Sequence, residues 1–170
     1  NTAWNYFATC LTSTSSTFTA NAGVFGKVYF PRLVMPISTV IYGLLSFAIQ
    51  FCVLMGFIVY FIAMGENIQP NITVCLIPVY IIHMAALGLG TGIIISSMTT
   101  KYRDLSILVG FGVQLWMYIT PIVYPLSTVP EQFRNLIMYN PMAPIINNFK
   151  YSMLGCGKME WGYWGISAIV

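Results

Sequence analysis

The stretch that decides the fold of this chain is TTKYRDLSILVGFGVQLWMYITPIVYP, residues 99–125. It opens with charged side chains at positions 101, 103 and 104, and no formal charge follows until position 131. A helix rises about 1.5 Å per residue, so about 20 residues cross a hydrocarbon layer of about 30 Å. We therefore predict that residues 105–125 form a membrane-spanning helix.

The segment that follows is too short and too interrupted to cross the membrane again. Five prolines fall between residues 121 and 144, and polar side chains such as Glu131, Arg134 and Asn140 alternate with short apolar runs. Irregular backbone persists at membrane depth only where protein buries it or where it lines a wet cavity. We predict that residues 126–158 form a re-entrant hairpin of short helices that enters the outer face and borders a pathway.

The composition indicates an all-α integral membrane protein. Hydrophobic residues make up 58% of the chain and charged residues 6%, and the mean hydropathy is +0.78, whereas soluble domains carry roughly 25% charged residues. A soluble helical bundle of this composition would lack the surface charge that keeps proteins in solution. The formal net charge of +3 is small and spread along the chain, so no nucleic-acid partner is expected.

The cations set the expected orientation of a single transmembrane domain, residues 1–170. Lys27 and Arg32 lie in the first polar segment, the second has no cation, and Lys101 and Arg103 lie in the third. Positive charges beside a span favour the cytoplasmic side. Because the sequence begins without methionine and ends inside an apolar run, we expect a longer polypeptide with at least one earlier span. The predicted segments are a partial span 1–20, a cytoplasmic coupling loop 21–33, a span 34–64, an outer loop 65–71, a span 72–98, a cytoplasmic turn 99–104 and, after the hairpin, the start of a last span 161–170.

Two stretches predict close helix packing. Residues 1–20 are rich in serine and threonine, whose hydroxyls can return hydrogen bonds to helix carbonyls, so a helix that faces other helices is favoured over an interfacial loop. Glycines and serines at positions 88–97 would let another helix approach closely.

The predicted spans contain few side chains that could ionise or bind a metal. His83 is the only histidine; a hydrogen-bonded neutral imidazole is the preferred interpretation, and an intramembrane proton relay is the alternative. Metal-type spacing is absent among the four cysteines, so we expect buried free thiols and no metal site at Cys10, Cys52, Cys75 and Cys156.

Several short motifs, taken in order, resemble those of type-2 ABC exporter permeases that move polysaccharides. The resemblance covers essentially the whole chain. Lys150 stands where members often carry arginine, which is a small departure. The motifs are WNYF at 4–7, KVYFPR at 27–32, LVMPIS at 33–38, YRD at 102–104, TPIVYP at 120–125, NPMAP at 140–144 and NNFK at 147–150.

This resemblance implies a six-helix transmembrane domain, of which the first span and most of the last lie outside this sequence. It also implies a homodimer in the bacterial cytoplasmic (inner) membrane and a separate ATP-binding subunit that holds ATP and magnesium. The chain itself would be a transport subunit without a cofactor, not an enzyme, and it contains no G-x-x-x-x-G-K-[ST] phosphate loop. Substrates of the family are lipid-linked O antigens, capsular polysaccharides or teichoic acids.

Two cytoplasmic segments receive roles from the resemblance. An aromatic and proline segment between cations can seat in a groove of the ATP-binding subunit, although a simple interfacial anchor is the alternative. At the start of the span 105–125, Arg103 and Asp104 are expected to pair locally rather than to contact substrate. The coupling residues are Lys27, Val28, Tyr29, Phe30, Pro31 and Arg32, and the span-start residues are Tyr102, Arg103 and Asp104.

A substrate conduit and an outer gate complete the expected site. Aromatic faces can stack on sugar rings, with ordinary packing as the alternative for each ring, and prolines end helices at points where short helices can swing. The conduit candidates are Tyr42, Phe47, Trp116, Tyr118 and Tyr124. The gate candidates are Thr120, Pro121, Pro125, Asn140, Pro141 and Pro144.

Other functional classes fit parts of the sequence. A type-2 permease for a drug or a lipid would share the fold, and a continuous aromatic-lined channel wide enough for a sugar chain would discriminate against it. An ion-coupled secondary transporter needs ionisable residues in the membrane, of which only His83 qualifies. A membrane enzyme would need a carboxylate pair or a nucleophile with its base, and the spans hold neither.

Overall fold

The computed structural model is a bundle of helices. It describes residues 1–21, 23, 31, 33–65, 72–102, 104–122, 124, 129–130, 134, 137–155 and 159–169, and these residues form helices and turns but no strand. The predicted all-α class is therefore confirmed for this part of the chain. The elements are α1 (Thr2–Ala20), α3 (Val34–Ala63), η1 (Ile72–Leu76), α4 (Ile77–Lys101), α5 (Leu105–Ile119), α7 (Met142–Leu154) and α8 (Trp161–Ile169).

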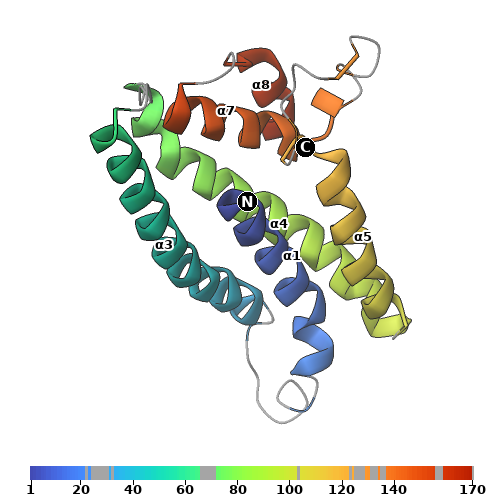
Figure 1. The fold of residues 1–170 in the computed structure, drawn as a ribbon. Coiled ribbons are helices and arrows are strands. Elements are labelled where there is room, and N and C mark those ends of the chain that lie inside the picture. Colours follow the sequence, from blue (N-terminus) through green and yellow to red (C-terminus); the bar gives the residue numbers. More distant parts are fainter. Residues whose placement is uncertain are drawn as a thin grey trace.

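Helix α1 forms the centre of the bundle. It packs most extensively on α4 and next on α3, and Figure 1 shows it in front of α4 with α3 to one side. Phe7 and Cys10 on α1 are fully buried. Thr12 Oγ1 donates to the carbonyl oxygen of Ala8 at 2.7 Å, which satisfies a hydroxyl within the helix. The predicted helix is confirmed here, and the alternative of an interfacial loop is excluded.

The contact between α1 and α4 is close because α4 presents glycines to it. A Cβ atom added at Gly88 would lie 2.8 Å from Cys10 Cβ, and one added at Gly92 would lie 2.6 Å from Thr14 Cβ. Such distances are shorter than packed carbon atoms allow, so only glycine fits. The predicted close approach of a helix to the small residues at 88–97 is confirmed.

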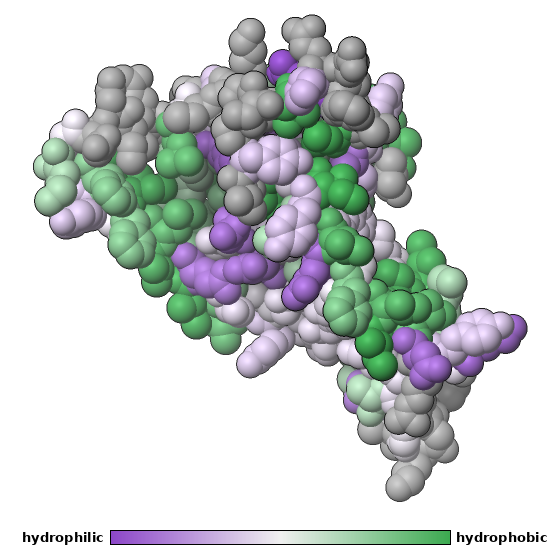
Figure 2. All heavy atoms as spheres, turned by 45° about the vertical axis from the view of Figure 1, so that its right-hand side comes forward, coloured by the Kyte–Doolittle hydropathy of each residue, from purple (hydrophilic) through white to green (hydrophobic). Residues whose placement is uncertain are grey.

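Helices α3 and α4 are long and apolar enough to cross a membrane. Only 11% of the most apolar stretch of α3 and 28% of that of α4 is buried, whereas the core helix of a soluble protein is mostly covered. Figure 2 shows hydrophobic surface on both sides of the molecule, with hydrophilic side chains toward the middle of the view and at its lower right. This exposed apolar surface indicates a lipid environment.

The cysteines differ in part from the prediction of buried thiols. Cys10 is buried, but Cys52 on α3 and Cys75 in η1 are exposed. The prediction is wrong for these two because the described elements cover their helices on one side only. Cys156 lies outside the described residues.

Helix α5 is shorter than the predicted helix 105–125, because it ends at Ile119. Thr120 has φ −85° and ψ 137°, the extended conformation that a following proline imposes on the residue before it. Thr120 Oγ1 donates to the carbonyl oxygen of Trp116 at 2.8 Å and so caps the helix end. At 15 residues, α5 is about 22 Å long.

Two ends of the molecule carry different elements. Helices α7 and α8 lie at the end where α3 finishes and α4 begins, whereas α1 finishes, α3 begins and α4 meets α5 at the opposite end (Figure 1). Of the predicted hairpin 126–158, the structure describes chiefly the turn at residues 137–141 and α7. Pro144 lies in the first turn of α7, where backbone N–H groups lack helical partners. The helix ends at Gly155, which has a φ of 67°.

Candidate functional site

Asn140 joins the end of α5 to the start of α7. Trp116 Nε1 donates to Asn140 Oδ1 at 3.0 Å, and Asn140 Nδ2 donates to Thr120 Oγ1 at 2.9 Å. The backbone N–H of Met142 donates to the same Oδ1 at 3.2 Å. Two of the three partners belong to the end of α5, and the third is the first residue of α7. The structure therefore brings the predicted gate residues Thr120 and Asn140 into direct contact.

Lys150 joins α7 to the residues that follow the end of α5. Its Nζ donates to the carbonyl oxygens of Pro121 and Ile122 at 2.7 and 2.8 Å. These carbonyls follow the end of α5, beyond the reach of its helical hydrogen bonds. Lys150 lies within the hairpin predicted to belong to the gate but was not among the named gate candidates, although a single cation within an apolar helix was a signal for it.

A second set of hydrogen bonds joins α4, α8 and the turn before α7. Trp164 Nε1 donates to His83 Nδ1 at 3.1 Å, and His83 Nε2 lies 3.1 Å from the carbonyl oxygen of Ser167. An indole N–H can only donate, so Nδ1 carries no proton and Nε2 is the donor to Ser167. This assignment from the hydrogen-bond network makes the imidazole neutral, as the preferred interpretation of His83 predicted. Ser167 Oγ donates to the carbonyl oxygen of Pro141 at 2.6 Å.

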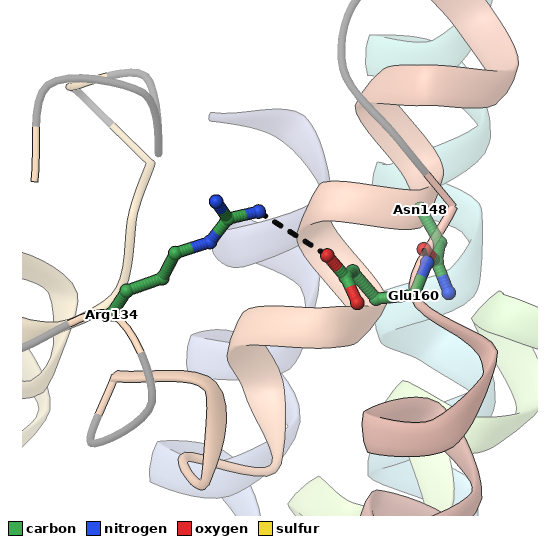
Figure 3. A network of polar contacts seen from close by, with 3 residues as sticks. All are labelled: Arg134, Asn148 and Glu160. Carbon is green, nitrogen blue, oxygen red and sulfur yellow. Dashed lines mark hydrogen bonds and ion pairs between the residues drawn. The ribbon is translucent and has the colours of Figure 1, made fainter. Parts of the chain in front are cut away.

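An ion pair lies between the hairpin and the segment before α8. Arg134 Nη2 is 3.4 Å from Glu160 Oε1, and the Glu160 N–H donates to Asn148 Oδ1 on α7 at 3.1 Å; Figure 3 shows the three side chains together. The Arg134 side chain is 43% exposed, so solvent screens the pair and its contribution is about 0–1 kcal/mol. Asn148 is fully buried, so its hydrogen bond to the Glu160 N–H is better shielded from solvent than the ion pair is.

A cavity of about 270 Å³ lies beside both sets of hydrogen bonds. Its lining includes His83, Trp116, Pro141 and Ser167. Most of its surface is apolar, with His83, Thr91 and Ser167 among the polar exceptions. The turn before α7 therefore borders open space as well as its hydrogen-bond partners.

Two of the predicted conduit aromatics serve as packing residues. Phe47 is 4% exposed, and its ring centroid lies 5.2 Å from that of Tyr6 and 5.7 Å from that of Phe51. This differs from its predicted place on a conduit wall, because the ring packs α3 on α1. Trp116 packs edge-on against Phe7 at 5.4 Å in addition to its bond with Asn140.

Of the other three conduit candidates, two are largely exposed and Tyr124 is half-buried. Tyr42 on α3 is 75% exposed and Tyr118 on α5 is 66% exposed. Tyr124 lies beyond the end of α5, and its hydroxyl donates to the carbonyl oxygen of Tyr118 at 3.3 Å. Helices α3 and α5 stand apart in Figure 1, so the described chain does not bring Tyr42 and Tyr118 together.

The predicted cytoplasmic residues are described only in part. Of the coupling residues 27–32, Pro31 alone is described, and its carbonyl oxygen accepts the N–H of Val34 at 3.0 Å. Lys27, Val28, Tyr29, Phe30 and Arg32 lie outside the described residues, as do the span-start residue Arg103 and the gate residue Pro125.

The turn between α4 and α5 contains the other two span-start residues. The carbonyl oxygen of Tyr102 accepts the N–H of Leu105 at 3.1 Å, and Asp104 is the residue before α5. Lys101 Nζ lies 5.3 Å from the centre of the Tyr102 ring. This turn therefore carries positive charge beside an aromatic side chain, as the ends of membrane helices commonly do.

Comparison with known proteins decides the family. A family model described as ABC-2 type transporter matches residues 2–154. The chain belongs to the ABC-2 type transporter family. The resemblance to type-2 ABC exporter permeases is thereby confirmed. The ABC-2 match extends from α1 to the end of α7, so it includes both sides of the Asn140 contact.

Three curated relatives of this chain are named as export system permease proteins. Two proteins of Klebsiella pneumoniae named O-antigen export system permease protein RfbA are 32% and 34% identical to this chain over 161 residues, 94% of the chain and 60% of each relative. A Myxococcus xanthus protein of the same name is 28% identical over 149 residues, 86% of the chain and 55% of the relative. The chain thus spans at most 60% of the length of these relatives.

Proposed function

We propose that this chain is the membrane-spanning permease part of an ATP-driven exporter. Its substrate would be a lipid-linked polysaccharide of the O-antigen, capsule or teichoic acid type, moved across the bacterial cytoplasmic (inner) membrane. The observation that carries this proposal is the similarity, over 94% of the chain, to relatives named O-antigen export system permeases. The exposed apolar lengths of α3 and α4 support a membrane location.

The complete permease would be a multi-pass, six-helix subunit that works as a homodimer with a separate ATP-binding subunit. Helices α3, α4 and α5 run alternately between the two ends of the molecule (Figure 1), which is the arrangement of successive spans. Ile107, Leu108 and Phe111 leave an apolar face of α5 exposed, which supports contact with lipid or with the second copy. ATP and magnesium would be held by the partner.

The outer gate would be built where α5 stops and α7 starts. Thr120 and Pro121 end the spanning helix, and Asn140, Pro141 and Pro144 start the short helix α7. The support is the double attachment of α7 to this break through Asn140 and Lys150. Short helices held at defined points can swing as units, which a continuous span cannot do. The exposed rings of Tyr42 and Tyr118 remain the candidates for contact with sugar.

Residues 27–32 would dock on the ATP-binding subunit at the opposite end. Pro31 lies just before α3, and Ala20 ends α1 at the same end of the molecule (Figure 1). A push on this loop would therefore reach both α1 and α3, and α1 packs on α4. Tyr29 and Phe30 are the side chains whose removal should matter most.

The test is export by the full-length permease reconstituted with its ATP-binding partner. We expect ATP-dependent movement of lipid-linked polysaccharide across vesicle membranes, and none from either subunit alone. The Tyr29→Ala/Phe30→Ala variant should assemble with the partner and lose most of the ATP-driven export, because the docking rings are missing. Full export by this variant would remove the coupling assignment. Export of a drug or a phospholipid in place of the polysaccharide would contradict the substrate class.

A further inference from the structure

We propose that neutral His83 is a positioning residue of the outer gate, which determines whether the turn before α7 stays attached to α8. The imidazole fixes Ser167, and the Ser167 hydroxyl holds the carbonyl oxygen of Pro141. The inference deepens the proposed gate function and depends on it. His83 contacts neither a substrate nor a cofactor in this role, so it would act through Ser167 alone.

The proton positions determine which atom donates and which accepts in each of these hydrogen bonds. Trp164 Nε1 is a donor only, so it determines that His83 Nδ1 accepts and that Nε2 donates. Nε2 faces the Ser167 carbonyl oxygen at 3.1 Å and its hydroxyl oxygen at 3.4 Å. The single hydroxyl proton of Ser167 goes to Pro141 at 2.6 Å. The hydroxyl proton is thus committed to Pro141, and the Nε2 proton of His83 is shared between the two oxygens of Ser167. Ser167 is 2% exposed, so water has little access to its side chain.

The turn before α7 is consequently held from two sides. Pro141 is bound to α8 through Ser167, while its neighbour Asn140 is bound to the end of α5 through Trp116 and Thr120. A gate that moves with α5 must break the Ser167 contact, and one that moves with α8 must break the Asn140 contact. Packed interfaces switch between such discrete arrangements instead of deforming smoothly. Because His83 holds Ser167 in place, it favours the arrangement in which the turn stays attached to α8.

Space for the movement lies beside the turn. The cavity of about 270 Å³ is lined by His83, Pro141 and Ser167 on one part of its wall and by Trp116 on another. Close-packed interiors resist side-chain movement, so a hollow at the meeting point of both attachments permits one contact to open while the other holds.

A purely structural role for His83 makes a different prediction. Trp164 also packs edge-on against Tyr80 at 5.4 Å and against Trp161 at 5.7 Å, and a packing role would need only the ring volume of His83. Two near-isosteric variants separate the hydrogen bonds. His83→Asn places an acceptor near Nδ1 and loses the donor to Ser167, whereas His83→Gln places a donor near Nε2 and keeps it.

The experiment measures gate leak and export with the full-length permease and its ATP-binding partner in vesicles. Leak is the escape of a small hydrophilic dye without ATP. We expect Ser167→Ala, His83→Phe and His83→Asn each to raise leak about fivefold, the change that corresponds to one net hydrogen bond. The His83→Gln variant should leak no more than the wild type. His83→Phe combined with Ser167→Ala should leak no more than Ser167→Ala alone, because both changes open the same contact.

Ser97→Ala is the matched control, because among the described contacts its hydroxyl bonds only to Ile93 within α4. The proposal is overturned if Ser167→Ala leaks no more than Ser97→Ala, or if His83→Asn and His83→Gln leak equally. It is also overturned if the leak of the double variant equals the combined effect of its two single changes. Should His83→Phe not fold, the near-isosteric pair decides alone. The dye assay needs no polysaccharide, so absence of polysaccharide export by the wild type would count against the proposed function while the leak pattern still judges His83.

Discussion

Replacing Asn140 with alanine is expected to destabilise the protein by about 2–4 kcal/mol and to remove one of the two attachments of α7 to the end of α5, leaving that of Lys150. The change removes the acceptor of both Trp116 Nε1 and the Met142 N–H, and also the donor to Thr120. Thr120 is fully buried, so water cannot replace the lost partner without local opening. Denaturation of the full-length protein in detergent measures the loss.

Two further variants show whether the loss comes from this contact. Thr120→Val removes one arm of the contact and should cost about 1–2 kcal/mol, and its combination with Asn140→Ala should cost less than the sum. Asn21→Ala is the control, because the Asn21 amide bonds only to Thr17 within α1 among the described contacts. Equal stability of the Asn140→Ala and Asn21→Ala variants would show that α7 is not held through Asn140.

Gly92→Ala is expected to cost about 1–3 kcal/mol by overpacking the contact between α1 and α4. The new methyl group would lie 2.6 Å from Thr14 Cβ and 3.2 Å from the carbonyl oxygen of Leu11. Neither atom can rotate away, because one belongs to the backbone and the other is bonded directly to it. The helices would have to separate, which should lower the melting temperature of the full-length protein.

Gly90→Ala provides the matched comparison two residues away on the same helix. Apart from the adjacent residues and backbone of α4 itself, no heavy atom of the described residues lies within 4 Å of a Cβ at this position, and alanine favours helix by up to about 1 kcal/mol over glycine. We therefore expect Gly90→Ala to leave the melting temperature unchanged or raised. If the two glycine variants melt together, α1 and α4 do not pack through Gly92.

Helix positions followed from the sequence where apolar length decided them. The runs at 34–64 and 72–98 predict α3 and α4 closely, because few interruptions compete with the helical pattern. The end of α5 was placed too late, because the apolar residues after Ile119 outweighed the effect of Pro121 on Thr120. Local backbone chemistry ended the helix although hydrophobicity continued past it.

The candidate site was predictable by residue type but not by partner. Asn140 and Thr120 stood out as a polar and a hydroxyl residue beside prolines, yet their hydrogen bond joins positions 20 apart and depends on how α7 folds back. His83 finds Trp164 and Ser167 at separations of 81 and 84 positions. Phe47 could not be separated from exposed aromatics, because only the position of α1 shows which face of α3 is covered.

The proposed permease requires the turn before α7 and the turn between α4 and α5 to face opposite sides of the membrane. Tyr139 and Tyr102 mark these turns and are 63% and 56% exposed. The test is labelling of Tyr139→Cys and Tyr102→Cys with a membrane-impermeant maleimide, in the full-length protein with its native cysteines replaced. In intact spheroplasts we expect label at position 139 alone, with position 102 labelled only after permeabilisation. Label at position 102 first, or at both positions before permeabilisation, would contradict an outer gate at this turn.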